Sequence, residues 1–222
     1  MTLKLVIFDF DGTLVDSQGT IVACMAQAFD AHGLEPPARS DILSIVGLSL
    51  PQAMAVLAPD ADRDGLVQAY KNAFASKRLS LGAADQSPLY PGARAAIERL
   101  HDQPDTLLGI ATGKSKRGLD ALLEAHGLAR YFVTCQVADH HPSKPHPSMV
   151  MTALVEAGVA ARDAVMLGDT TFDMQMAQGA GVPFVGVGWG YHSPDQMHGA
   201  HAVIRDFDAL DAALHAIWEP EP

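Results

Sequence analysis

Cysteine and long apolar runs are scarce in this sequence. Its 222 residues include only two cysteines, Cys24 and Cys135, which lie far apart in the chain. Such a pair is more typical of small buried side chains in a reducing compartment than of a disulfide. No apolar run approaches the roughly 18 residues that a membrane-spanning helix needs, and the first residues do not show the pattern of a secretory signal peptide. These absences predict a cytoplasmic protein that does not enter a membrane.

Positive charge is also in short supply. The chain has 15 lysines and arginines against 26 aspartates and glutamates, for a formal net charge of −11. This excess weakens non-specific attraction to nucleic acids and to anionic membranes, so we expect neither as a partner. The length allows one large domain, or one domain with an insert. A protein this acidic that handles an anionic substrate must supply positive charge locally, from a lysine or a metal ion.

The strongest pattern lies at residues 3–17. An almost unbroken apolar run leads into Asp9 and Asp11, after which Gly12 and Thr13 break the pattern. Such a run is typical of a strand buried on both faces of a parallel sheet, and open α/β sheets bind ligands where their strands end. Two carboxylates this close repel each other, and a divalent cation would relieve the repulsion. The alternative is an ordinary turn with a capping aspartate and a glycine at positive φ.

Helical spacing of apolar residues dominates residues 17 to 80. We expect four helical segments there, the first capped by Ser17 and ended by His32–Gly33, with no strand between them. From Pro91 onward, strands alternate with helices, which predicts a parallel sheet covered on both faces. The predicted strands cover residues 106–112, 132–137, 164–169, 183–187 and 202–204, and the predicted helices 93–100, 115–126, 148–157, 171–180 and 207–218.

These patterns predict an α/β protein with a doubly wound, Rossmann-like parallel sheet and an inserted bundle of helices. The core domain is expected to consist of residues 1–16 and 88–222, and the inserted helical domain of residues 17–87. The oligomeric state is expected to be a monomer or a weak homodimer.

Three further strand ends or loops carry suggestive residues. Thr112 and Gly113 precede a helix, where a hydroxyl and free backbone N–H groups can bind an anion, although a capped turn is the alternative. Lys144 lies in a loop stiffened by prolines, although a lone lysine is usually a solvated surface charge. Asp169 and Asp173 follow another apolar run; alternatively, Asp169 caps a helix and Asp173 interacts with its dipole. Parallel strands end at one edge of a sheet, so we expect these groups to converge.

Taken in order, these segments resemble the four motifs of haloacid dehalogenase-superfamily phosphatases. The matching residues are Asp9-Phe10-Asp11-Gly12-Thr13-Leu14, Thr112, Lys144-Pro145, and Gly168-Asp169 with Asp173. The helical insert after the first motif is similar to the cap of the phosphoglycolate phosphatase-like branch. The resemblance extends over essentially the whole chain and implies an Mg²⁺-dependent phosphatase whose partner is a small phosphorylated metabolite, such as phosphoglycolate or a sugar phosphate.

The resemblance also implies a role for each matching residue. Asp9 would attack phosphorus to form an aspartyl-phosphate, while Asp11 would protonate the leaving group and later activate water. The catalytic residues would be Asp9, Asp11, Thr112 and Lys144. The phosphoryl group would be bound by Gly12, Thr112, Gly113 and Lys144. Mg²⁺ would be held by Asp9, the backbone carbonyl of Asp11, Asp169 and, directly or through water, Asp173.

The inserted helices would then act as a lid that excludes water and selects the leaving group. The rather apolar turn Val46–Ser49 is expected to contact the substrate. A second anionic group on the substrate would need one of the few cations of the insert, namely Arg39, Arg63, Lys71, Lys77 or Arg78.

Other functions could use the same scaffold. A sugar-phosphate mutase would form the same aspartyl-phosphate but return the phosphoryl group to its substrate. A hydrolytic dehalogenase resembles this fold without the metal or the second acid, whereas Asp11 and Asp169 are both present here. A phosphonatase would need a cap lysine for a Schiff base, for which Lys71 is the candidate. A non-catalytic phospho-ligand-binding protein should have lost one of the catalytic residues, and none is missing.

Overall fold

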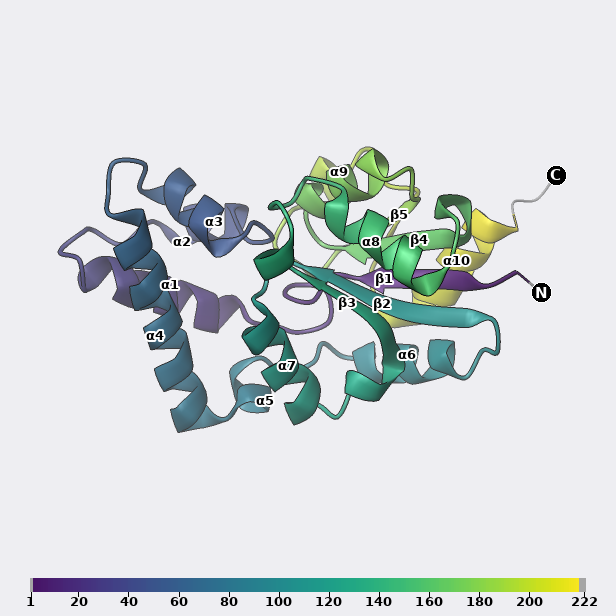
Figure 1. The fold of residues 1–222 in the computed structure, drawn as a ribbon, viewed down its shortest axis with the longest axis horizontal. Coiled ribbons are helices and arrows are strands. Elements are labelled where there is room, and N and C mark those ends of the chain that lie inside the picture. The colour runs from purple at the N-terminus through teal and green to yellow at the C-terminus, as the bar shows by residue number, and fades with distance from the viewer. Residues whose placement is uncertain (1, 220–222) are drawn as a thin grey trace.

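A six-stranded parallel sheet forms the centre of the protein, which a computed structural model describes for residues 2–219 (Figure 1). The strands are β1 (Lys4–Phe8), β2 (Thr106–Thr112), β3 (Phe132–Val137), β4 (Ala164–Gly168), β5 (Phe184–Val187) and β6 (Ala202–Ile204). Their order is β3-β2-β1-β4-β5-β6. The chain therefore winds outward in both directions from β1, which confirms the predicted doubly wound α/β fold.

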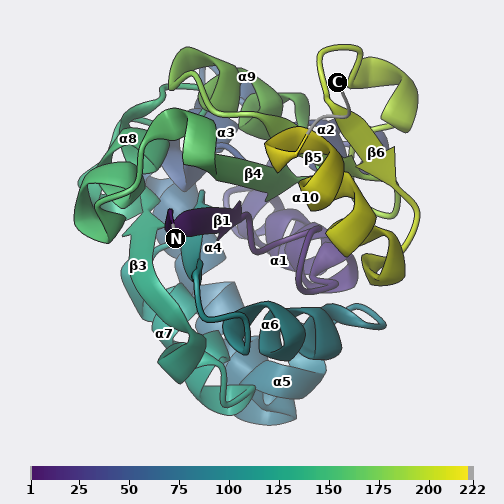
Figure 2. The same cartoon turned by 90° about the vertical axis from the view of Figure 1, so that its right-hand side faces the viewer.

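Strand β1 is buried because alternate side chains pack into two different cores. Val6 and Phe8 join one hydrophobic cluster, and Leu5 and Ile7 join the other. The first cluster is covered by α6 (Ala93–His101), α7 (Lys116–Ala125) and α10 (Leu210–Trp218). The second is covered by α8 (Ser148–Ala157) and α9 (Thr171–Gly179). Figure 2 shows α8 and α9 on one side of the sheet and α6 on the other.

Six helices lie between β1 and β2, and the five that precede α6 form the predicted insertion, one more than the four helical segments expected. These five are α1 (Gln18–Asp30), α2 (Arg39–Ser44), α3 (Leu50–Leu57), α4 (Arg63–Leu81) and the short α5 (Ala83–Gln86). The insertion has its own core, in which Met25, Phe29, Met54 and Leu66 are buried together. The C-terminal ends of the central strands point toward this bundle (Figure 1). The division of the chain at 16/17 and 87/88 stays a prediction.

Two further findings bear on the expectations from composition. Cys24 is buried, Cys135 is half-buried, and both are free thiols. Within residues 2–219, no helix combines the length and the apolar character needed to span a membrane.

Candidate active site

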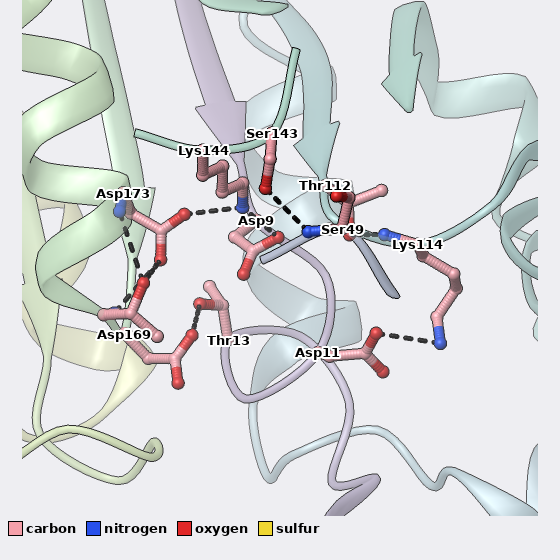
Figure 3. A network of polar contacts seen from close by, with 11 residues as sticks. Asp9, Asp11, Thr13, Ser49, Thr112, Lys114, Ser143, Lys144, Asp169 and Asp173 are labelled. Carbon is pink, nitrogen blue, oxygen red and sulfur yellow. Dashed lines mark hydrogen bonds and ion pairs between the residues drawn. The ribbon is translucent and has the colours of Figure 1, made fainter. Parts of the chain in front are cut away.

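Three aspartates from separate segments meet where β1 and β4 end (Figure 3). These two strands pair in parallel with Phe8 opposite Leu167, so Asp9 and Asp169 emerge side by side at the same edge of the sheet. Asp173 reaches the same place from the first turn of α9. One carboxylate oxygen from each of the three lies within 4.8 Å of the others, and all three side chains are buried.

Lys144 lies between two members of this aspartate cluster, Asp9 and Asp173. Its Nζ is 2.8 Å from Oδ1 of Asp9 and donates a hydrogen bond of 2.6 Å to Oδ1 of Asp173. Burial lowers the pKa of Lys144, but the carboxylates of Asp173 and Asp9 raise it by more, so its pKa lies above the ordinary value for lysine. The interpretation of Lys144 as a solvated surface charge is wrong, because the residue is only 1% exposed. The Lys144–Pro145 peptide bond is cis.

One buried lysine does not balance three buried aspartates. Burial and the charge of Asp173 raise the pKa of Asp9 to about 7, against the lowering effect of Lys144. Burial, Asp173 and Asp9 likewise raise the pKa of Asp169 well above its usual range. Oδ1 of Asp9 is fully buried, and its polar neighbour is Nζ of Lys144. A cluster of three hard carboxylate ligands whose negative charge exceeds that of the single buried lysine fits a small divalent cation.

Two residues hold the carboxylate of Asp169 in place, and the sequence motifs did not predict this role for either of them. The hydroxyl of Thr13 donates to its Oδ1 at 3.1 Å, and the backbone N–H of Tyr191 donates to its Oδ2 at 2.8 Å. The first contact depends on the tight turn at Gly12, which has φ of +85° and where a Cβ atom would lie 2.2 Å from Oδ2 of Asp169. Glycine at this position therefore lets the turn after β1 pack directly against Asp169.

The interpretation of Asp169 as the cap of α9 is wrong. Thr170 is the N-cap: its hydroxyl accepts a hydrogen bond from the backbone N–H of Asp173, whose Oδ2 in turn accepts from the backbone N–H of Thr170. This is a reciprocal capping box. Because Oδ1 of Asp173 accepts from Lys144, both oxygens of Asp173 are engaged within the protein. Asp173 is therefore well placed to hold Lys144 beside Asp9.

Asp11 points away from the aspartate cluster (Figure 3). Its Oδ2 lies 2.8 Å from Nζ of Lys114, and its Oδ1 accepts a 2.6 Å hydrogen bond from the hydroxyl of Ser17. Ser17 does precede α1 as expected, but its side chain makes no cap hydrogen bond because it is committed to Asp11. The pairing of Lys114 with Asp11 was not predicted, and the only sequence signal for it was that Lys114 directly follows Thr112 and Gly113.

Comparison with known proteins agrees with this geometry. The family described as haloacid dehalogenase-like hydrolase matches residues 6–187. The chain belongs to the haloacid dehalogenase-like hydrolases. It is 36% identical to a Dickeya dadantii protein named "Probable phosphatase IndB", over 96% of this chain and 94% of that protein. It is 31% identical to a phosphoglycolate phosphatase from Agrobacterium fabrum, over 95% and 91% of the two chains.

A solved structure shows the same architecture. The crystal structure of a hydrolase from Pseudomonas syringae superimposes with a TM-score of 0.81 at 25% identity, covering 94% of this chain and 96% of that one. These matches confirm the resemblance to the phosphoglycolate phosphatase-like branch and the expected enzyme class, a hydrolase of the phosphatase type.

In this haloacid dehalogenase-like hydrolase the inserted helices rest directly on the core. The backbone N–H of Ser49 donates to the hydroxyl of Ser143 at 2.8 Å, and Nε2 of His192 lies 3.1 Å from the carbonyl oxygen of Ser44. Gly113, at the end of β2, is so close to the insert that a Cβ atom there would lie 2.5 Å from the carbonyl oxygen of Gly47. The turn 46–49 therefore already contacts the segment that follows Thr112.

A cavity of about 600 Å³ remains between the insert and the core. Asp9, Asp11, Thr112 and Gly113 lie in its wall, together with the turn at residues 45–51. Among residues 2–219, the aspartate cluster of residues 9, 169 and 173 is the only group of three or more acidic, histidine or cysteine side chains that could share a metal ion.

Proposed function

We propose that this protein is an Mg²⁺-dependent phosphatase that hydrolyses a small phosphomonoester through an aspartyl-phosphate on Asp9. The observation that carries the proposal is the placement of two different acids at the cavity. Asp9 is buried beside Lys144, whereas Asp11, two residues later, turns toward the insert and is held by Ser17 and Lys114. The family membership and the phosphatases among its relatives support the same reaction.

The two acids would share the reaction in two steps. A carboxylate oxygen of Asp9 attacks phosphorus, the ester P–O bond breaks, and Asp11 gives its proton to the departing alkoxide. Asp11, now a carboxylate, then takes a proton from water. The water oxygen attacks phosphorus, the bond to Asp9 breaks, and inorganic phosphate leaves. Thr112, the backbone N–H of Gly113, and Lys144 would hold the phosphoryl oxygens, since catalysis of phosphoryl transfer is mainly positioning and charge stabilisation. The backbone N–H of Gly12, expected to share this role, instead donates to the carbonyl oxygen of Val15 at 2.9 Å.

The metal site would use Asp9, Asp169 and the backbone carbonyl of Asp11. A bound Mg²⁺ would supply positive charge opposite the phosphoryl oxygens and reduce the repulsion among the buried carboxylates. Thr13 and Tyr191 would fix the orientation of Asp169, because outer partners orient metal ligands. Asp173 would act mainly by holding Lys144.

Removal of divalent metal should stop the hydrolysis of p-nitrophenyl phosphate. We expect phosphate release to fall to background in EDTA and to return when Mg²⁺ is added in excess, because the charge of the aspartate cluster disfavours binding of an anion without a cation. Phosphate release is measured directly. Undiminished turnover in EDTA would contradict the metal site. Isomerisation of a sugar phosphate without release of phosphate would indicate that the protein is a mutase instead.

Replacing Asp11 by asparagine should separate the two steps. p-Nitrophenolate leaves without a proton, so we expect Asp9 to be phosphorylated still, while the second step slows by about 10²–10⁴-fold because no base activates water. Rapid mixing should show a burst of about one p-nitrophenolate per enzyme molecule, and intact mass measurement should show the phosphorylated chain. The exposed neighbour Asp16 provides the control, since Asp16→Asn should turn over like the natural enzyme. Unchanged steady-state turnover in Asp11→Asn would contradict its assigned role.

A further inference from the structure

We propose that the physiological leaving group is amphipathic, with an apolar body about the size of an aromatic ring and a carboxylate or other anionic group at its far end. This inference rests on the proposed phosphatase function and narrows its substrate class. It is drawn from the volume of the cavity, the apolar residues in its walls and the cations that line it.

The cavity is much larger than a two-carbon leaving group requires. Its volume of about 600 Å³ lies in the range of roughly 300–1,000 Å³ that is typical of sites for drug-sized ligands. The insert contacts the core beside this cavity through the Ser49–Ser143 hydrogen bond and the close approach of Gly47 to Gly113. This volume is therefore present while the turn at residues 46–49 is in contact with the core.

Much of the cavity wall is apolar. Helix α1 contributes Ile21 and Met25, the turn after α2 contributes Ile45 and Val46, and α4 contributes Phe74. A glycolate leaving group has a single methylene and would leave most of this surface against water. An apolar body would remove it from water, at roughly 25 cal/mol per Å² buried.

Three cations with solvent-exposed or half-buried side chains also line the cavity. On α4, Lys71, Phe74, Ala75 and Arg78 recur at the i, i+3, i+4 and i+7 spacing of one helix face, and all four line the cavity. The core helix α7 contributes Arg117. Among residues 2–219, the ion pairs do not include any of these three cations.

The positions of these cations indicate where the second anionic group of the substrate would bind. Phe74 is close to the acid Asp11, because Nζ of Lys114 lies 5.2 Å from the centre of its ring and 2.8 Å from Asp11. Lys71 lies three residues before Phe74 on α4 and Arg78 four residues after it, rises of roughly 4.5 Å and 6 Å along the helix. Asp139 also lines the cavity, but its Oδ2 accepts from the backbone N–H of Lys116. If an aromatic ring separates the substrate's second anionic group from its phosphate, that group would therefore lie near more cations than acids. The chain as a whole carries a net charge of −11.

Three primary-alcohol phosphates test the substrate class: 2-phosphoglycolate, benzyl phosphate and 4-carboxybenzyl phosphate. All need protonation of an alkoxide, so differences in kcat/KM report mainly the fit of the leaving group. We expect 4-carboxybenzyl phosphate to exceed 2-phosphoglycolate by at least about tenfold, with benzyl phosphate between them, because a pocket that matches an apolar group discriminates by about 10–200-fold.

Charge variants on α4 test the second anion. Arg78→Gln and Lys71→Gln should each lower kcat/KM for 4-carboxybenzyl phosphate by about tenfold and leave benzyl phosphate within about twofold, because only the carboxylate loses its partner. Arg63→Gln, on the same helix but outside this cavity, should change neither substrate.

Two outcomes would overturn the inference while leaving the phosphatase intact: a preference for 2-phosphoglycolate over both ring esters, or an equal loss on both ring esters in the charge variants. Absence of phosphate release from all three esters and from p-nitrophenyl phosphate would overturn the proposed function, and this inference with it.

Discussion

Asp9→Asn should abolish phosphate release from every phosphomonoester while leaving the protein folded. An amide has no carboxylate to attack phosphorus, and loss of a covalent nucleophile lowers turnover by at least about 10³-fold. The fold should tolerate the change because asparagine has nearly the same volume and Lys144 keeps its hydrogen bond to Asp173. Burial and Asp173 already raise the pKa of Asp9 to about 7, so its charged form is not a source of stability without metal. Phosphate release and the midpoint of thermal unfolding in EDTA measure the two effects.

A second buried aspartate provides the matched control. Asp163 is 8% exposed and lies just before β4, at the opposite edge of the sheet, where it forms a 2.8 Å ion pair with Lys4. Asp163→Asn should keep kcat/KM within about twofold, because the pair is remote from the cavity and a partly exposed ion pair contributes little. Retained activity in Asp9→Asn, with unfolding unchanged, would show that another residue is the nucleophile.

The sheet could be predicted from the sequence because its strands are buried on both faces. The apolar runs that form β1 and β2 have no competing helical period, and the predicted strand at residues 106–112 matches β2 residue for residue. The predicted helix at 148–157 likewise matches α8. The far end of α4 was less clear. The helical segments of the insertion were expected within residues 17–80, but α4 continues to Leu81 and the short α5 follows it.

The sequence also allowed the prediction that the site residues converge, but not the prediction of the residues that hold them in place. Topology alone brings Asp9 and Asp169 to one edge, because parallel strands end together. The contact of Thr13 with Asp169 instead joins residues 156 positions apart through the paths of two loops, which no local pattern encodes. The cap of α9 shows the same limit. Asp169 and Thr170 are both good capping residues, and Thr170 takes that place because the carboxylate of Asp169 is held by Thr13 and Tyr191.

The contacts of Lys114 link the inserted helices to Asp11, the proposed general acid. Lys114 joins the core residue Asp11 to the ring of Phe74 on α4, so the position of the inserted helices affects the surroundings of the proposed general acid. A leaving group that fills the cavity would lie against the same ring. Selection of the leaving group and delivery of its proton would thus depend on one contact between the two parts of the chain.

Lys144→Met should cause both a loss of activity and the largest loss of stability of any substitution considered. Methionine fits the space of the buried lysine stem, but it leaves Asp9 and Asp173 close together without a cation. Breaking a buried ion pair by removing one partner typically costs about 3–5 kcal/mol. We expect the free energy of unfolding, measured with urea in EDTA at pH 8, to fall by about this amount. Excess Mg²⁺ should restore part of the loss if the remaining carboxylates bind it.

The effect should depend on pH in a defined direction. The pKa of Asp9 is raised to about 7 in the folded protein, so between about pH 4 and 7 the native state binds more protons than the unfolded chain, and stability rises as the pH falls. Loss of Lys144 strengthens this preference for protonated acids, so the destabilisation should be smaller at pH 5 than at pH 8. The control is Lys4→Met, which removes the more exposed pair with Asp163 and should cost about 1 kcal/mol or less. Equal, pH-independent losses in the two variants would show that Lys144 does not neutralise the buried acids.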